Sequence, residues 1–189
     1  MNPLEDLAGW TRRAKKSLIF EPGPSTVEVH HGRAEIERLL PHRPPFLFVD
    51  RITAIDLEQK AIAGRRTIDP ADPIFAGHFP GAPIYPGVLG LETMGQLGIC
   101  LTSFLARGAT DVPESVRPAE VRALHVHHAT FQREVLPGDV LNILAVALTR
   151  DDFGAICAGQ LSIERSSAPL GRGAETIASF AVMEVYFVE

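Results

Sequence analysis

The sequence has little cysteine and little positive charge. Only 2 of its 189 residues are cysteines, Cys100 and Cys157, and both lie inside apolar runs. Their spacing predicts neither a disulfide framework nor a zinc site, so we interpret them as reduced core residues. Lys and Arg number 18 against 23 Asp and Glu, which gives a formal net charge of −5. The chain therefore lacks a global basic field that would attract nucleic acid, and no nucleic-acid partner is expected.

Targeting and membrane signals are also lacking. The first twenty residues contain no continuous apolar stretch of the kind found in a signal peptide, which predicts a cytoplasmic protein. Residues 88–106, VLGLETMGQLGICLTSFLA, are nearly long enough to cross a bilayer. An acid at the centre of an inserted helix costs about 2.5–3.5 kcal/mol, however, so Glu92 favours a buried helix of a soluble protein. We expect no membrane association.

Nucleophile and nucleotide motifs are missing too. The sequence contains no G-x-S-x-G elbow that would present a serine, and no glycine-rich loop that would hold a phosphate. Nucleotide-dependent chemistry is therefore not expected.

Length and composition predict one globular domain with an N-terminal extension. Of the residues, 46% are hydrophobic and 22% are charged, as is typical of soluble proteins. Apolar residues recur at helical spacing over residues 4–18, and EPGPS at 21–25 then interrupts the chain. We assign the extension to residues 1–30 and the domain to residues 31–189. Basic residues on the short amphipathic helix form either a solvated face or a contact for an acidic partner.

The remaining pattern predicts mainly strands. Residues 34–46 indicate one or two helical turns stopped by prolines, and residues 46–56 and 60–68 are predicted to form a hairpin. Further strands of a meander are predicted at residues 121–131, 139–152, 153–164 and 175–188. One long helix at about 88–106 among these strands, with short connections, predicts an α+β architecture in which an antiparallel sheet wraps around a helix.

The long helix carries an isolated acid. Glu92 is the only formally charged side chain between Pro73 and Ala106, and on a helical wheel it shares an arc with Gln96 and Ser103. Burial in apolar surroundings raises the pKa of a carboxyl, as a general acid near neutral pH requires. The alternative is that Glu92 stands near the helix start because it interacts favourably with the helix dipole.

The segment before this helix supplies a base and backbone donors. PGAPIYPG contains three prolines and two glycines, so it specifies the chain path into Gly87 and can present free amides at the helix start. His78 is either a structural residue or a base with a reference pKa near 6.5. A base, an acid and amide donors together suit chemistry next to a carbonyl: proton removal, stabilisation of an enolate-like oxygen, and protonation of a leaving group.

Three segments carry a family resemblance. LPHRPPFLFVDRI (40–52), GHFPGAPIYPGVLGLETMGQ (77–96) and ATFQREVLPGDVL (129–141) resemble the 3-hydroxyacyl-acyl carrier protein dehydratases of fatty acid biosynthesis. The resemblance implies a hot-dog fold and a homodimer with active sites between subunits, or a trimer of such dimers. It also implies a hydro-lyase that forms a trans-2-enoyl thioester from a substrate carried on the phosphopantetheine arm of acyl carrier protein, without a metal or organic cofactor.

The resemblance also implies roles for individual residues. His78 would abstract the C2 proton, Glu92 of the other subunit would protonate the departing C3 hydroxyl, and the Gly87 amide would bind the thioester carbonyl. Further implied substrate-binding residues are Tyr85, Val88, Phe79 and Gln96. Candidates for contacts with the acidic carrier protein are Arg65, Arg66, Arg122 and Arg133, although for each of them an ordinary solvated arginine is the favoured interpretation.

Several alternatives stay open. Glu92 favours the dehydratase-only branch, whereas the surrounding GLE-x-M-x-QL is also similar to the branch that isomerises the double bond. Tyr85 stands where a methionine is common, which leaves acyl chain length open. The pathway can be fatty acid, polyketide or polyene synthesis. The rival functions are a hot-dog acyl thioesterase and a non-catalytic subunit that binds acyl carrier protein.

The remaining histidines are predicted to be structural. His42 belongs to the first motif of the resemblance. His125, His127 and His128 form H-x-H-H in a predicted strand, where His125 and His127 would share a face. Because no carboxylate or thiol is near them in the sequence, no metal site is expected.

Overall fold

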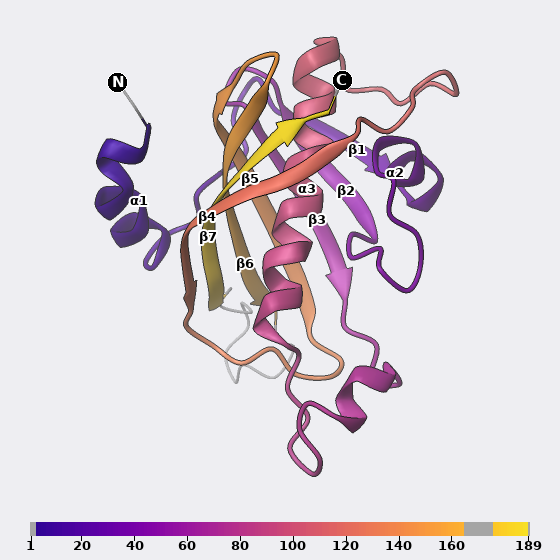
Figure 1. Cartoon of the computed structure of the whole chain (residues 1–189), viewed down its shortest axis with the longest axis vertical. Helices are drawn as coiled ribbons and strands as arrows, with labels where there is room; N and C mark the ends of the chain where they lie inside the picture. Colours follow the sequence, from indigo (N-terminus) through magenta and orange to yellow (C-terminus); the bar gives the residue numbers. More distant parts are fainter. Residues whose placement is uncertain (1–2, 165–175, 189) are drawn as a thin grey trace.

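The fold is a seven-stranded antiparallel sheet that curves around one long helix (Figure 1). The computed structural model describes residues 3–164 and 176–188. The helical elements are Pro3–Asp6 (η1), Leu7–Ala14 (α1), Arg33–Leu39 (α2), Pro73–Ala76 (η2) and Gly87–Arg107 (α3). The strands are Val27–His31 (β1), Arg51–Asp56 (β2), Ala61–Thr67 (β3), Val121–Phe131 (β4), Val140–Arg150 (β5), Gly154–Glu164 (β6) and Thr176–Phe187 (β7).

Strand order places two strands that are distant in the sequence side by side. The order across the sheet is β1-β2-β3-β5-β6-β7-β4, so β4 pairs with β7 and forms one edge of the sheet. The predicted four-stranded meander is correct only for β5, β6 and β7, which pair antiparallel in chain order. It was wrong for β4, which pairs with β7 instead of with β5. The predicted hairpin is formed by β2 and β3.

Helix α3 fills the concave side of the sheet. Met94, Leu97 and Leu101 are at most 1% exposed and belong to the main hydrophobic core. The helix is long and apolar enough to cross a membrane, yet 56% of its most apolar stretch is buried inside the protein. It is therefore the core helix of the fold, and the predicted hot-dog arrangement is confirmed.

Helix and sheet approach closely because the contact contains small residues. A Cβ atom built on Gly98 of α3 would lie 3.5 Å from Cβ of Cys157, and one built on Gly159 of β6 would lie 2.7 Å from Cβ of Met94. Burial of the thiol between the two layers raises the pKa of Cys157 to about 12. Cys100 is also buried, and both cysteines are free thiols.

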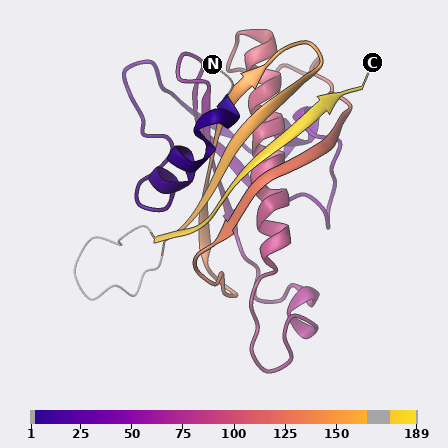
Figure 2. The ribbon, with the colours of Figure 1, turned by 60° about the vertical axis from the view of Figure 1, so that its left-hand side comes forward.

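The N-terminal segment covers the opposite face of the sheet. Figure 2 shows α1 and α3 on different sides of the strands. Leu7 and Trp10 pack against Phe180 and Val182 of β7. Fully buried Gln160 of β6 holds the segment after α1. Its side-chain amide donates to the carbonyl oxygens of Ala14 at 2.7 Å and Ser17 at 3.0 Å, and its Oε1 accepts from the Ile19 amide at 3.1 Å.

Two local predictions differ from the structure. The sheet begins at β1, Val27–His31, which the sequence analysis did not predict because the strand is short and mostly exposed. The strand predicted from residue 46 begins only at Arg51. Residues 46–48 form no strand, because side chains instead of a neighbouring strand bind their backbone groups. Gln96 donates to the Phe46 carbonyl and accepts from the Phe48 amide, and Arg66 donates to the Leu47 carbonyl.

Candidate active site

His78 lies in a tightly braced loop after η2. Its amide donates to the Ile74 carbonyl at 3.0 Å, and its carbonyl accepts from the Ile84 amide at 3.0 Å. The ring atom Nδ1 lies 2.8 Å from the Ile84 carbonyl oxygen. Because a carbonyl can only accept, Nδ1 carries the proton of the neutral ring. Nε2 is therefore left with a free lone pair, as a base requires.

A cavity of about 410 Å³ opens beside this ring. This volume lies within the range of small-molecule sites. Its lining includes His78, Tyr85, Gly87, Val88, Phe131 and Leu161. We call it the histidine cavity. Most of its surface is apolar, and polar or charged side chains of His78, Gln132, Arg133, Glu134 and Ser179 interrupt it.

The start of α3 supplies hydrogen-bond donors to the histidine cavity. Pro86 precedes the helix and provides no side-chain cap. Within the described part of the chain, the amides of Gly87 and Val88 have no hydrogen-bond partner, whereas the Leu89 and Gly90 amides donate to the Pro86 carbonyl. Free amides at a helix start can stabilise a developing negative charge on an oxygen.

Tyr85, which lines this cavity, packs against Arg66 in the protein interior. Tyr85 is 3% exposed, and burial raises the pKa of its hydroxyl although the nearby Arg66 guanidinium opposes the rise. Arg66 is 8% exposed, and its guanidinium lies 4.5 Å from the ring centre of Phe48 and 5.7 Å from that of Tyr85. The prediction that Arg66 contacts a carrier protein was wrong, because this side chain points into the protein from β3.

Glu92 lies one turn further along α3 and is held by two neighbours. Gln96 Nε2 donates to Glu92 Oε1 at 2.9 Å, and His42 Nε2 lies 3.4 Å from the same oxygen. About a third of the Glu92 side chain, 33%, is exposed. Glu92 and His42 line a second cavity of about 250 Å³, together with Val88, Leu91, His125 and Glu184. We call it the glutamate cavity.

Gln96 lies behind Glu92 rather than in either cavity. Its side chain is completely buried. Besides the bond to Glu92, Nε2 donates to the Phe46 carbonyl at 3.0 Å, and Oε1 accepts from the Phe48 amide at 2.7 Å. The prediction of a substrate contact for Gln96 was wrong, because its hydrogen-bonding groups are used inside the protein. Instead, Gln96 fixes the carboxylate of Glu92.

A single chain does not bring His78 and Glu92 together. The two residues line different cavities, and Val88 lines both. Large apolar side chains nearby are unusually exposed for their type: Phe79 (52%), Val88 (67%), Val126 (56%) and Phe131 (54%). Phe79 stacks on the His78 ring with centroids 4.1 Å apart. Exposed apolar side chains of this kind are typical of surfaces that bind a partner or a ligand.

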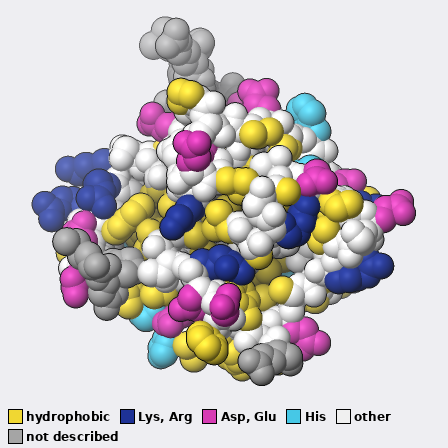
Figure 3. All heavy atoms as spheres, turned by 90° about the horizontal axis from the view of Figure 1, so that it is seen from above, with side chains coloured by type: hydrophobic (Ala, Val, Ile, Leu, Met, Phe, Trp, Pro, Cys, Tyr) yellow, Lys and Arg dark blue, Asp and Glu magenta, His cyan; other side chains and the backbone are white. Residues whose placement is uncertain are grey.

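The other predicted basic contacts lie at different places. Arg65 pairs with Glu164 at 3.3 Å and Arg122 pairs with Glu120 at 3.7 Å. Arg133 lines the histidine cavity and also a neighbouring hollow that Lys15 and Lys16 line. Seen from above, Lys and Arg side chains gather at the left of the molecule, the side on which α1 lies in Figure 1 (Figure 3).

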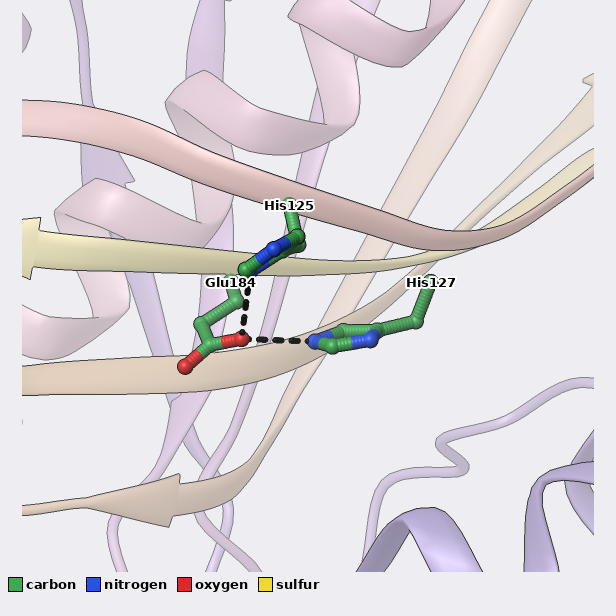
Figure 4. Close-up of side chains that lie close together, drawn as sticks. All are labelled: His125, His127 and Glu184. Atoms are coloured by element: carbon green, nitrogen blue, oxygen red, sulfur yellow. Dashed lines mark hydrogen bonds and ion pairs between the residues drawn. The ribbon is translucent and has the colours of Figure 1, made fainter.

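The sequence analysis missed two residues near these cavities. His42 contacts Glu92, although its motif suggested only a structural role. Glu184 of β7 joins His125 and His127 of β4 (Figure 4). A carboxylate therefore does accompany these histidines. Only the pairing of β4 with β7 could have revealed it, because Glu184 is distant in the sequence.

Fold and cavities together define a hot-dog protein with an apolar site at the start of its central helix. The FabA-like domain family matches residues 40–166, and the chain belongs to this family. It is 40% identical over 114 residues to the 3-hydroxyacyl-[acyl-carrier-protein] dehydratase FabZ of Chlamydia trachomatis, covering 60% of this chain and 71% of that protein. Over 117 residues it is 40% identical to FabZ of Xanthomonas oryzae pv. oryzae, covering 61% of this chain and 71% of the relative.

A solved structure supports the fold. The dehydratase heterocomplex ApeI:P from Xenorhabdus doucetiae superposes with a TM-score of 0.58 at 18% identity, covering 82% of this chain and 91% of that one. At this identity the similarity concerns the fold alone.

Proposed function

We propose that the protein dehydrates 3-hydroxyacyl-acyl carrier protein to trans-2-enoyl-acyl carrier protein in fatty acid biosynthesis or a related polyketide or polyene pathway. The observation that carries the proposal is the position of His78. Its Nδ1 proton is bound by Ile84, and its cavity also contains the free Gly87 and Val88 amides. The two FabZ relatives, named as dehydratases of this type, support the assignment.

The proposed reaction uses one base, one acid and two amides. Nε2 of His78 takes the proton from C2, and the negative charge that develops on the thioester oxygen is stabilised by the amides of Gly87 and Val88. Glu92 then donates a proton to the C3 hydroxyl, which leaves as water while the C2–C3 double bond forms. Since Gln96 and His42 both contact Oε1 of Glu92, the other carboxyl oxygen, Oε2, is the proton donor. Proton exchange with water returns both side chains to their starting states.

The proposed active site needs two chains. His78 of one subunit acts with Glu92 of its partner, because the two residues line separate cavities within one chain. The exposed Phe79, Val88 and Phe131 would be covered by this contact. Edge strand β4 offers a further surface for pairing. Among the described residues, only those of β7 pair with it, so the backbone groups on its other side are open to another strand. Assembly of such dimers into a trimer of dimers stays a prediction.

The proposed partner is an acidic acyl carrier protein. Its phosphopantetheine arm would enter the histidine cavity past Arg133, which lines that cavity. Arg65 and Arg122 remain weaker candidates, because each is paired with an acid of its own chain. The proposed steps use only protein side chains and amides. The cytoplasmic location stays a prediction.

The test is turnover of a 3-hydroxyacyl thioester linked to acyl carrier protein, with the enoyl product followed by mass spectrometry. We expect His78→Ala and Glu92→Gln each to lower turnover at least about a hundredfold. His30→Ala and Glu28→Gln on exposed parts of β1 are the matched controls and should leave turnover unchanged. Turnover that survives both active-site substitutions would exclude the proposed mechanism.

The same assay separates the rival functions. A hot-dog thioesterase would release free carrier thiol, which a thiol reagent detects, and would form no enoyl product. A non-catalytic subunit would bind the acyl carrier protein and leave the hydroxyacyl thioester intact.

A further inference from the structure

We propose that His125, His127 and Glu184 bind a divalent transition-metal ion of the Zn²⁺ class. The two histidines lie on edge strand β4 and the glutamate lies on the neighbouring strand β7. In Figure 4 both imidazole rings point to the carboxylate of Glu184. The cluster shares no residue with the proposed catalytic groups.

The spacing of the three side chains suits one ion. Nδ1 of His125 lies 3.3 Å from Oε2 of Glu184, and Nε2 of His127 lies 2.7 Å from the same oxygen. One potential ligand atom from each residue lies within 4.8 Å of the others. Bonds of about 2.0–2.1 Å place tetrahedral zinc ligands about 3.3 Å apart. Nδ1 of His125 already lies at this distance from Oε2 of Glu184. Nε2 of His127 would need to move about half an ångström further from the same oxygen.

The register of the two strands explains why these residues converge. His125 lies opposite Glu184, and the register shifts between Val126 and His128, so that His127 also reaches the Glu184 carboxylate. His128 is excluded from the cluster, because its Nε2 lies 2.7 Å from Oγ1 of Thr130. Two of the three histidines of the H-x-H-H motif therefore share one carboxylate.

The ligand chemistry fits the proposed ion. Imidazole nitrogens with a carboxylate oxygen suit Zn²⁺, and also Ni²⁺ or Cu²⁺. Three protein ligands leave a fourth position for water. The side chains are 62% (His125), 20% (His127) and 27% (Glu184) exposed in the single chain, so an ion can enter from solvent.

A bound ion would have a local structural effect. It would bridge β4 and β7 and so hold the edge strand in place. His125 and Glu184 also line the glutamate cavity, so the ion would lie at the wall of the cavity that contains Glu92.

The test is a Zn²⁺ titration of tag-free protein, stripped with a chelator, by isothermal calorimetry. We expect one ion per chain and at least about tenfold weaker binding to His127→Ala and Glu184→Gln, since even the loss of a group that only orients a metal ligand costs ten- to a hundredfold. Glu184→Gln keeps an oxygen that accepts hydrogen bonds from the histidines, which protects the fold. His30→Ala, which removes an exposed histidine at the other edge of the sheet, should bind Zn²⁺ like the wild type.

Two further measurements use the same proteins. At the same Zn²⁺ concentration, the Tm of the wild type and of His30→Ala should rise more than that of Glu184→Gln. In the wild type, Zn²⁺ should shift the imidazole nitrogen resonances of His125 and His127 in NMR spectra. The absence of stoichiometric binding, equal affinity in all variants, or shifts only at other histidines would overturn the proposal and indicate a hydrogen-bonded cluster. Because no substrate is present, these results are independent of the dehydratase assay.

Discussion

Gln96 donates a hydrogen bond of 2.9 Å to Glu92, although the Gln96 side chain is completely buried. The same amide group also binds the backbone of Phe46 and Phe48. The carboxylate of the proposed acid is therefore attached to the packed interior of the chain. This attachment fixes which of its oxygens can face a substrate.

Gln96→Leu is expected to reduce both stability and turnover. The substitution leaves the Phe46 carbonyl and the Phe48 amide without a partner, at about 1–3 kcal/mol for each buried group, and it releases the Glu92 carboxylate. Urea unfolding should give a free energy of unfolding lower by about 2–6 kcal/mol. The turnover number of the folded protein should also fall, by less than in Glu92→Gln.

Gln160→Leu is the matched control for Gln96→Leu. Gln160 is also completely buried, but its hydrogen bonds hold the segment after α1. We expect a comparable loss of stability and faster proteolysis within residues 1–19, with unchanged turnover by the folded protein. An equal loss of turnover in both variants would mean that Gln96 acts only through stability.

A mixed dimer of His78→Ala and Glu92→Gln subunits should regain activity. Each homodimer lacks one group in both sites, whereas a heterodimer purified through two different tags contains one complete site and one that lacks both groups. Its turnover should reach roughly half of the wild-type value. A heterodimer as inactive as both homodimers would place the whole site within one chain.

Asp56 is expected to make stability depend on acid pH. Burial raises the pKa of its carboxyl, but hydrogen bonds from the Gln59 backbone, Thr26, the Gln59 side chain and Ser25 outweigh this and lower the pKa to about 2. A folded-state pKa below the ordinary value of 3.8 gives stability that is present above about pH 4 and lost as the pH falls toward 2.

Urea unfolding at several pH values tests this expectation. Asp56→Asn should be less stable than the wild type at pH 7, and the difference should shrink as the pH falls toward 2. Asp152→Asn, at an exposed position, should follow the wild type at every pH. A constant difference between wild type and Asp56→Asn would contradict the lowered pKa.

Two glycines at the contact between α3 and the sheet should respond in opposite ways to alanine. Gly159→Ala places a methyl group 2.7 Å from Cβ of Met94, so overpacking should cost about 1–3 kcal/mol. Gly98→Ala places a methyl group at an ordinary 3.5 Å from Cβ of Cys157, and the higher helix propensity of alanine adds up to about 1 kcal/mol. Thermal unfolding should give a lower Tm for the first variant and an unchanged or higher Tm for the second.

Charge reversal at Arg133 should weaken use of the carrier-linked substrate. Arg133→Glu places a negative charge at the histidine cavity and should raise KM for 3-hydroxyacyl-acyl carrier protein several-fold at low salt, with little change for a pantetheine thioester. Arg122→Glu is the control, because Arg122 does not line that cavity. If KM rises more in Arg122→Glu than in Arg133→Glu, the carrier protein contacts the start of β4 rather than the histidine cavity.

Local sequence signals predicted most of the sheet. The predicted strand at residues 121–131 coincides with β4, and those at 139–152 and 153–164 differ from β5 and β6 only at their ends. These segments alternate or are rich in Val, Ile and Phe, which is the signal of a strand, although β4 is mostly exposed and β6 is buried along most of its length. β1 lacks this signal, and the segment at residues 46–50 has it without forming a strand, because Gln96 binds its backbone.

The sequence by itself determined the family and the residue types of the proposed site. The order and spacing of its motifs led to the dehydratase family, to the hot-dog fold and to His78, Glu92 and Gly87 as candidates. These features lie in short continuous segments, where local spacing carries the information.

Only the tertiary structure decided which side chains meet. In the folded chain Arg66 and Gln96 are buried, and His78 and Glu92 line separate cavities. Glu184 contacts two histidines of another strand. The physical reason is that strand register and the packing of helix on sheet join residues far apart in the chain. Periodicity within a single segment contains no information about such contacts.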